Sequence, residues 1–77
     1  MSYDVNIIFS RHLLSMIVDD VRKAGYRINK DAWVWKAGEG HYEFHGPNGY
    51  WDGAISASNA YEARYKGWSD FLECEAA

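Results

Sequence analysis

Residues 32–55 read AWVWKAGEGHYEFHGPNGYWDGAI. In this segment, short runs of β-branched and aromatic residues are separated by two glycine-containing clusters, at 38–40 and 46–49, a pattern typical of strands joined by tight turns. The segment therefore predicts a three-stranded antiparallel meander, with strands at about residues 32–37, 41–45 and 50–55.

The segment before the meander has its apolar residues at helical spacing: Leu13, Leu14, Ile17, Val18 and Val21. We expect a helix at about residues 10–24, with Ser10 as its N-cap and Gly25 as the residue that stops it. Residues 4–9 are rich in β-favouring side chains. The sequence leaves open whether they form an edge strand or an extended lead-in.

The segment after the meander predicts a second helix at about residues 59–74. Asn59 is a suitable N-cap, and Glu62 follows it at the spacing of a capping box. The apolar stripe of this helix suits packing on a sheet and consists of Tyr61, Trp68, Phe71 and Leu72. Gly67 interrupts the helix pattern, so we interpret it as a point of close contact with a strand.

The 77 residues are too few for two separate cores. We therefore predict a single small α+β domain over residues 1–77, with element order α-β-β-β-α and both helices packed on one face of the three-stranded antiparallel meander. The expected core consists of Leu14, Ile17, Val18, Val21, Phe44, Trp51, Trp68, Phe71 and Leu72.

Composition narrows the class of protein. Hydrophobic residues make up 48% of the chain and aromatic residues 17%, which predicts an ordered globular domain. Cys74 is the single cysteine, so no intramolecular disulfide can form and we expect a cytoplasmic location. No apolar run approaches the roughly 20 residues that span a bilayer, and no signal-like segment is visible, so we expect no membrane partner.

The second hairpin determines which side chains share a face of the sheet. A two-residue loop at Pro47 and Asn48 would pair His45 with Tyr50 and Glu43 with Asp52. Because side chains alternate along a strand, the core face would then carry Tyr42, Phe44, Trp51 and Ile55. The opposite face would carry the candidate partner-binding residues: His41, Glu43, His45, Tyr50 and Asp52.

Glu43 and Asp52 form a like-charge pair in this arrangement, which is unfavourable unless a cation lies between them. One register of the first hairpin supplies Lys36 as that cation and points Trp33 and Trp35 into the core. We favour this register because burying Lys36 would be costly. In the alternative register both tryptophans join the open face and form an exposed aromatic patch typical of an interaction site.

The same polar face raises the question of a metal. His41, Glu43, His45 and Asp52 offer nitrogen and oxygen donors, but the two histidines lie about 13 Å apart along a straight strand. They cannot bind one ion without a bend, so we expect no metal and no cofactor. An open sheet face also lacks a cleft, so we expect no enzymatic activity; a small metal- or carboxylate-dependent enzyme is one alternative.

A basic cluster at the end of the first helix is the alternative contact, for nucleic acid. Its members are Arg22, Lys23, Arg27 and Lys30. The element order is similar to the layout of double-stranded-RNA-binding domains, which carry a lysine-rich cluster at the start of the last helix. Residues 58–62 occupy that position here and read SNAYE, without a base. The resemblance is one of topology, and nucleic acid is the less favoured partner.

The net charge is −3, and seven of the eleven acids follow Lys36, so the second half of the chain is the acidic half. Together these features predict a small acidic, non-enzymatic protein-binding module, for example a modulator or inhibitor of a larger protein machine, of the kind that phages and mobile elements also encode. A homodimer formed through a strand edge is a further alternative.

Overall fold

The computed structural model describes residues 5–28 and 32–76, and it has the predicted order of helix, three strands and helix. The elements are α1 (Val5–Lys23), β1 (Trp33–Gly38), β2 (His41–His45), the short 3₁₀ turn η1 (Pro47–Gly49), β3 (Trp51–Ser56) and α3 (Ala60–Ala76). The strands form one antiparallel sheet in the order β1-β2-β3. The predicted α+β meander is confirmed.

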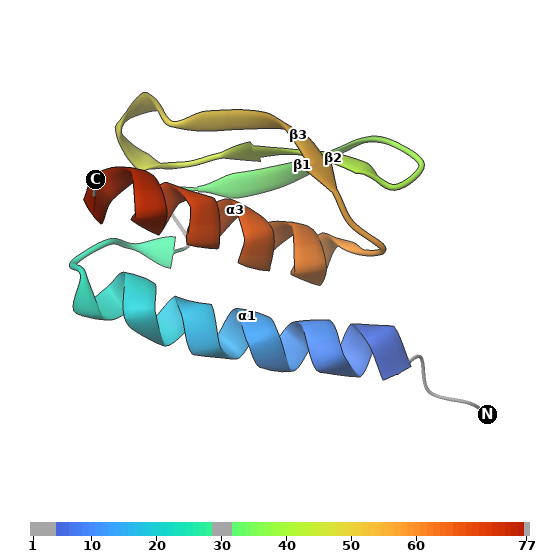
Figure 1. Ribbon diagram of the computed structural model, residues 1–77, viewed down its shortest axis with the longest axis horizontal. Helices are drawn as coiled ribbons and strands as arrows, with labels where there is room; N and C mark the ends of the chain where they lie inside the picture. Colours follow the sequence, from blue (N-terminus) through green and yellow to red (C-terminus); the bar gives the residue numbers. More distant parts are fainter. Residues whose placement is uncertain (1–4, 29–31, 77) are drawn as a thin grey trace.

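The elements form three layers (Figure 1). α3 lies directly on one face of the sheet, and α1 packs against the side of α3 that points away from the sheet. Both helices are therefore on the same side of the sheet, as predicted, but α1 reaches the rest of the fold mainly through α3. No described helix covers the other face of the sheet.

α1 begins earlier than the sequence indicated. Residues 5–9 are helical, so neither an edge strand nor an extended lead-in is correct for them; Asp4 lies outside the described residues. Ser10 is not an N-cap but a buried residue inside α1. Extending an existing helix adds one backbone hydrogen bond per residue, and this gain outweighs the weak β preference of the segment. The helix ends as expected, with Gly25 at a φ of 95°.

The core lies mainly between α3 and the sheet, and α1 adds Val21 to it. Its largest fully buried side chains are Val21, Phe44, Trp68 and Phe71, all of them predicted. Trp68 and Phe71 meet at a ring distance of 5.7 Å in an edge-to-face arrangement. A Cβ atom at Gly67 would lie 2.2 Å from Cγ of Phe44, so the predicted close contact between this glycine and a strand is confirmed.

The second hairpin differs from the prediction by one residue. Its loop has three residues, Pro47–Gly49, and is closed by a hydrogen bond from the Gly46 amide to the Tyr50 carbonyl (2.8 Å). His45 is consequently opposite Trp51, and the predicted two-residue loop is wrong. Because the side-chain period of a strand is two, one extra loop residue moves every following side chain to the other face.

This shift reverses the faces of the first half of β3. Trp51 points away from the helices and is exposed, so its assignment to the core is wrong. Between Asp52 and Ile55 the pairing with β2 is irregular, with one extra residue in β3. This β-bulge shifts the alternation back, and Ile55 is buried as predicted.

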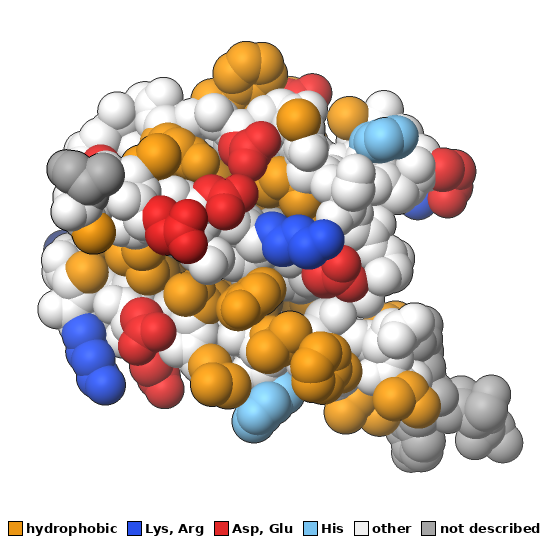
Figure 2. All heavy atoms as spheres, viewed as in Figure 1, with side chains coloured by type: hydrophobic (Ala, Val, Ile, Leu, Met, Phe, Trp, Pro, Cys, Tyr) orange, Lys and Arg blue, Asp and Glu red, His pale blue; other side chains and the backbone are white. Residues whose placement is uncertain are grey.

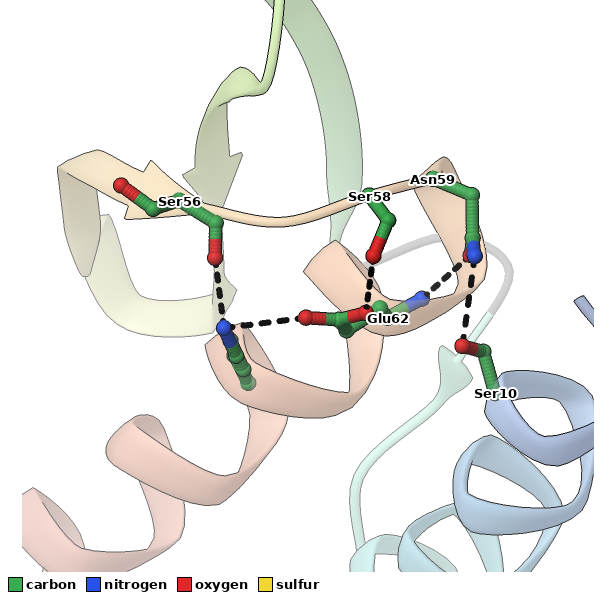
Figure 3. Close-up of polar contacts among 6 residues, drawn as sticks. Ser10, Ser56, Ser58, Asn59 and Glu62 are labelled. Atoms are coloured by element: carbon green, nitrogen blue, oxygen red, sulfur yellow. Dashed lines mark hydrogen bonds and ion pairs between the residues drawn. The ribbon is translucent and has the colours of Figure 1, made fainter. Parts of the chain in front are cut away.

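Polar contacts at the start of α3 join the layers (Figure 3). The Glu62 amide donates to Oδ1 of Asn59 (2.9 Å), which confirms Asn59 as the N-cap. The Asn59 side-chain amide donates in turn to Oγ of Ser10 on α1 (3.3 Å). Ser58 donates to Glu62 (2.8 Å), and this hydrogen bond, helped by Lys66, holds the pKa of Glu62 below its usual value.

Candidate functional site

The uncovered face of the sheet collects tryptophan side chains. β1 pairs with β2 so that Trp33 is opposite His45 and Trp35 is opposite Glu43. Residues directly opposite each other project to the same face of a sheet. Since the neighbouring Phe44 points into the core, both tryptophans point away from the helices together with Glu43 and His45.

Trp51 completes this surface from the third strand. His45 is opposite both Trp33 and Trp51, so the three side chains form a row across the sheet. The Trp51 indole lies over Gly53, where a Cβ atom would be 2.5 Å from the ring. We call the surface the tryptophan face and define it as Trp33, Trp35, Glu43, His45 and Trp51.

The tryptophans of this face are largely in contact with solvent. The exposed fractions are 48% for Trp33, 58% for Trp35 and 61% for Trp51. Sequence reasoning missed Trp51 as a member of the site. The signal that could have identified it is the odd number of residues in the loop Pro47–Gly49, because loop length sets the facing of the strand that follows.

The first hairpin adopts the register that we did not favour. Trp33 and Trp35 are exposed, whereas Lys36 is opposite the buried Tyr42. The expected cost of burying Lys36 does not arise, because this residue is near the end of β1 and its side chain remains 55% exposed. There it pairs with Glu39 of the following turn (3.4 Å) instead of neutralising Glu43.

Three of the five candidate partner-binding residues lie on the uncovered face: His41, Glu43 and His45. The other two lie on the helix side because of the changed loop. The Tyr50 ring packs edge-on against Phe71 of α3, with 5.5 Å between ring centres. Asp52 approaches Asp70 of α3, so the expected pair of Glu43 with Asp52 does not form.

The two carboxyl groups between β3 and α3 influence each other. Partial burial, a hydrogen bond with Asp52 and the negative charge of Asp52 all raise the pKa of Asp70. Glu73 adds to this effect, and Lys66 opposes it. The site is an acidic cluster at the edge of the core, and the cluster lies on the opposite side of the sheet from the tryptophan face.

His45 is the centre of the tryptophan face. Its ring stacks on Trp33, with 5.0 Å between centres and an interplanar angle of 2°. It also contacts Trp35 at 5.2 Å with a tilt of 41°. Its Nε2 lies 3.3 Å from Oε1 of Glu43. These contacts fix His45 as part of the surface, while both indoles remain about half exposed.

The basic cluster lies elsewhere. Arg22 and Lys23 form the last turn of α1, where positive charge suits the helix dipole, and both are exposed. Arg27 follows in the exposed connection, and Lys30 lies outside the described residues. α3 and the sheet separate α1 from the tryptophan face (Figure 1), so Arg22 and Lys23 of α1 do not share a surface with the tryptophans.

α1 carries a second apolar surface. Figure 2 shows hydrophobic side chains along α1 and acidic side chains over α3. The large exposed apolar residues of α1 are Val5, Ile8, Phe9 and Met16. A shallow, mainly apolar groove between α1 and α3 is lined by Arg11, Leu14, Ser15, Val18 and Tyr61. The Arg11 guanidinium lies 5.6 Å from the centre of the Tyr61 ring.

Searches for other kinds of site within residues 5–28 and 32–76 give negative results. No group of three or more histidine, cysteine, aspartate or glutamate side chains is placed to hold a metal ion. In the same part of the chain, no helix is both long and apolar enough to cross a membrane. Cys74 is exposed and carries a free thiol.

Comparisons with protein-family models, with curated proteins and with solved structures find no significant match to this chain.

Proposed function

We propose that this chain is a non-enzymatic protein-binding module and that the tryptophan face is its docking surface. The observation that carries the proposal is that three of the four tryptophans stand about half exposed on one uncovered sheet face. An indole buries 150–250 Å² when it is covered, at about 25 cal/mol per Å². A small domain that leaves three indoles in water forgoes core stability, which is reasonable if a partner covers them.

The composition of the face fits a protein partner. Tryptophan is among the residues most enriched in the energetically dominant centres of protein interfaces. Three strands about 4.8 Å apart and roughly 17 Å long present a surface of only a few hundred Å². A standard interface buries about 800 Å² on each partner, so we expect the contact to extend from the tryptophan face onto the adjoining turns.

Nucleic acid suits this face less well. Exposed indoles can stack on bases, but binding also needs cations along the phosphate backbone. Among the described residues the tryptophan face carries Glu43 and neither lysine nor arginine. The basic residues Arg22 and Lys23 belong to α1, which lies on the far side of α3 from the sheet (Figure 1). A protein partner is therefore the better-supported proposal.

The test compares two surface variants of the tagged protein. The first carries Trp35→Ser and Trp51→Ser on the tryptophan face, and the matched control carries Ile8→Ser and Phe9→Ser on the exposed surface of α1. Proteins captured from lysate of the native source are identified by mass spectrometry, and the affinity of the purified partner is then measured. Circular dichroism and sedimentation check that each variant is folded and in the same association state.

We expect the parent and the α1 control to bind the same partner, with at least a tenfold loss of affinity in the tryptophan variant, because buried interface tryptophans contribute about 2 kcal/mol or more. A folded tryptophan variant that binds as tightly as the parent would overturn the proposal. Loss of binding in the α1 control alone would move the docking surface to α1.

A further inference from the structure

Glu43 is the carboxylate of the tryptophan face and is opposite Trp35. Its Oε1 lies 3.3 Å from Nε2 of His45, and the side chain is 33% exposed. Within residues 5–28 and 32–76, no lysine or arginine contacts this carboxylate, since the nearest strand lysine, Lys36, points to the other side and binds Glu39. The tryptophan face thus carries a net negative group without a full positive counter-charge from the described chain.

His45 shows what kind of group this surface holds. A flat, nitrogen-bearing ring stacks on the Trp33 indole and places its nitrogen next to Glu43. Trp35 is directly opposite Glu43 on the neighbouring strand, and it is more exposed than Trp33. His45 meets Trp35 only at a tilt (5.2 Å, 41°) and Glu43 only through Oε1. The exposed part of the Trp35 indole and the second oxygen of Glu43 therefore lie side by side without a further partner in the described chain.

We propose that the partner presents an arginine, whose guanidinium stacks on Trp35 and pairs with Glu43. A guanidinium is planar, stacks on aromatic faces and offers several N–H donors to a carboxylate, whereas an ammonium is a compact, strongly hydrated charge. The charge also suits an acidic chain of net charge −3. This inference rests on the proposed docking function and adds the chemistry of the partner to it.

The probe is a capped glycine-arginine-glycine tripeptide, with a citrulline tripeptide as the neutral analogue of the same shape. Indole Nε1–H signals are followed by NMR in low salt and assigned with single Trp→Phe variants. We expect the Trp35 signal to shift in a saturable way with the arginine peptide. We expect the citrulline peptide to bind roughly three to ten times more weakly, as the loss of a cation–π contact and an exposed ion pair predicts.

Two substitutions test the residues. Glu43→Gln keeps the shape of the side chain and removes its charge, and it should weaken the arginine peptide about threefold or more. Glu73→Gln removes an exposed charge from α3 and should leave the affinity unchanged. Equal binding of the two peptides, or an unchanged affinity in Glu43→Gln, would overturn the inference.

The two proposals fail separately. If the captured partner is lost by the Trp35→Ser and Trp51→Ser variant but retained at full affinity by Glu43→Gln, the docking surface stands and the arginine inference is wrong. If the partner is retained by both variants, both proposals are wrong. If both variants lose it and the partner's affinity falls on changing one of its arginines to alanine, both are supported.

Discussion

β2 has two surfaces of similar aromatic character and opposite environment. On the helix side, Tyr42 and Phe44 are exposed by only 6% and 1%. On the other side, Glu43 and His45 are surrounded by indoles that remain about half exposed. Both faces of the sheet around β2 carry aromatic residues. The two faces differ because α3 covers one of them and no described helix covers the other. An aromatic residue in a strand therefore does not by itself indicate which face of the sheet is covered.

The largest contrast should come from truncating one ring on each side. Phe44→Ala removes a buried ring from the contact with Gly67 and Trp68, and it should lower the free energy of unfolding by about 3–5 kcal/mol. Trp35→Ala removes an exposed ring and should cost under about 1 kcal/mol. Urea unfolding measures both, and a loss of more than 2 kcal/mol in Trp35→Ala would assign this indole a structural role.

A glycine-to-alanine substitution adds one methyl group on either face of the sheet, the one covered by α3 or the uncovered one. Gly67→Ala places a Cβ atom 2.2 Å from the buried Phe44 ring, which cannot move aside, and should cost about 2–3 kcal/mol despite the better helix propensity of alanine. Gly53→Ala places one against the exposed Trp51 ring, which can swing into solvent, so we expect a cost under about 1 kcal/mol.

Thermal unfolding of the two alanine variants compares them under one set of conditions. Near-ultraviolet circular dichroism should change in Gly53→Ala, because the Trp51 indole moves. Equal stability of the two variants would contradict the expectation that the buried Phe44 ring cannot move aside and the exposed Trp51 ring can.

A smaller effect on stability is expected at the start of α3, where Asn59 contacts Ser10 of α1. Asn59→Ala removes the N-cap of α3 and the hydrogen bond to Ser10, and it should lower the free energy of unfolding by about 1 kcal/mol. Asn59→Asp keeps the acceptor for the Glu62 amide and serves as the control. If Asn59→Ala is as stable as the parent, neither the N-cap nor the hydrogen bond to Ser10 contributes to stability.

The smallest effect concerns the acidic cluster on the helix side. The pKa of Asp70 is raised above its ordinary value of 3.8, so the folded protein binds more protons than the unfolded chain at that pH. Stability from this group is therefore present at low pH and is lost as the pH rises through the folded-state pKa. Asp70 is exposed and solvent screens its charge, so Asp70→Asn should be more stable than the parent at pH 7 by no more than a few tenths of a kcal/mol, and the difference should vanish below pH 3.8.

Glu62 provides a control of opposite sign for this pH dependence. Its pKa is lowered by Ser58 and Lys66, so its contribution is present at neutral pH and is lost on acidification. Glu62→Gln should be less stable than the parent at pH 7, and the gap should close as the pH falls below the ordinary value of 4.5. Unfolding curves at a series of pH values measure both variants, and parallel curves for all three proteins would contradict the assignment.

The sequence predicted those features that depend on local patterns. The element order, the facing of Tyr42 and Phe44, the N-cap Asn59 and the contact at Gly67 all follow from spacing and residue type. The start of α1 could not be predicted from local patterns. Residues 5–9 have a strand-like composition, and they are helical because they continue the helix formed by the residues after them.

The candidate site could be predicted only in part, since it depends on counting residues in turns. The β2 members Glu43 and His45 were identified because alternation within one strand is robust. Trp33, Trp35 and Trp51 depend on how two turns connect the strands, and a difference of one residue exchanges the faces. The compensating bulge before Ile55 has no clear sequence signature other than Gly53.

The layered arrangement in which α1 rests on α3 has a consequence for hydrogen exchange. We expect α1 to separate from α3, where Ser10 contacts Asn59, before the strands part, because α1 has few contacts with the sheet. Its amide hydrogens should then exchange through a partial opening that costs less free energy than complete unfolding, while those of β2 exchange only when the whole domain unfolds. The tryptophan face would remain assembled during that opening, so the proposed docking would not depend on the motion of α1.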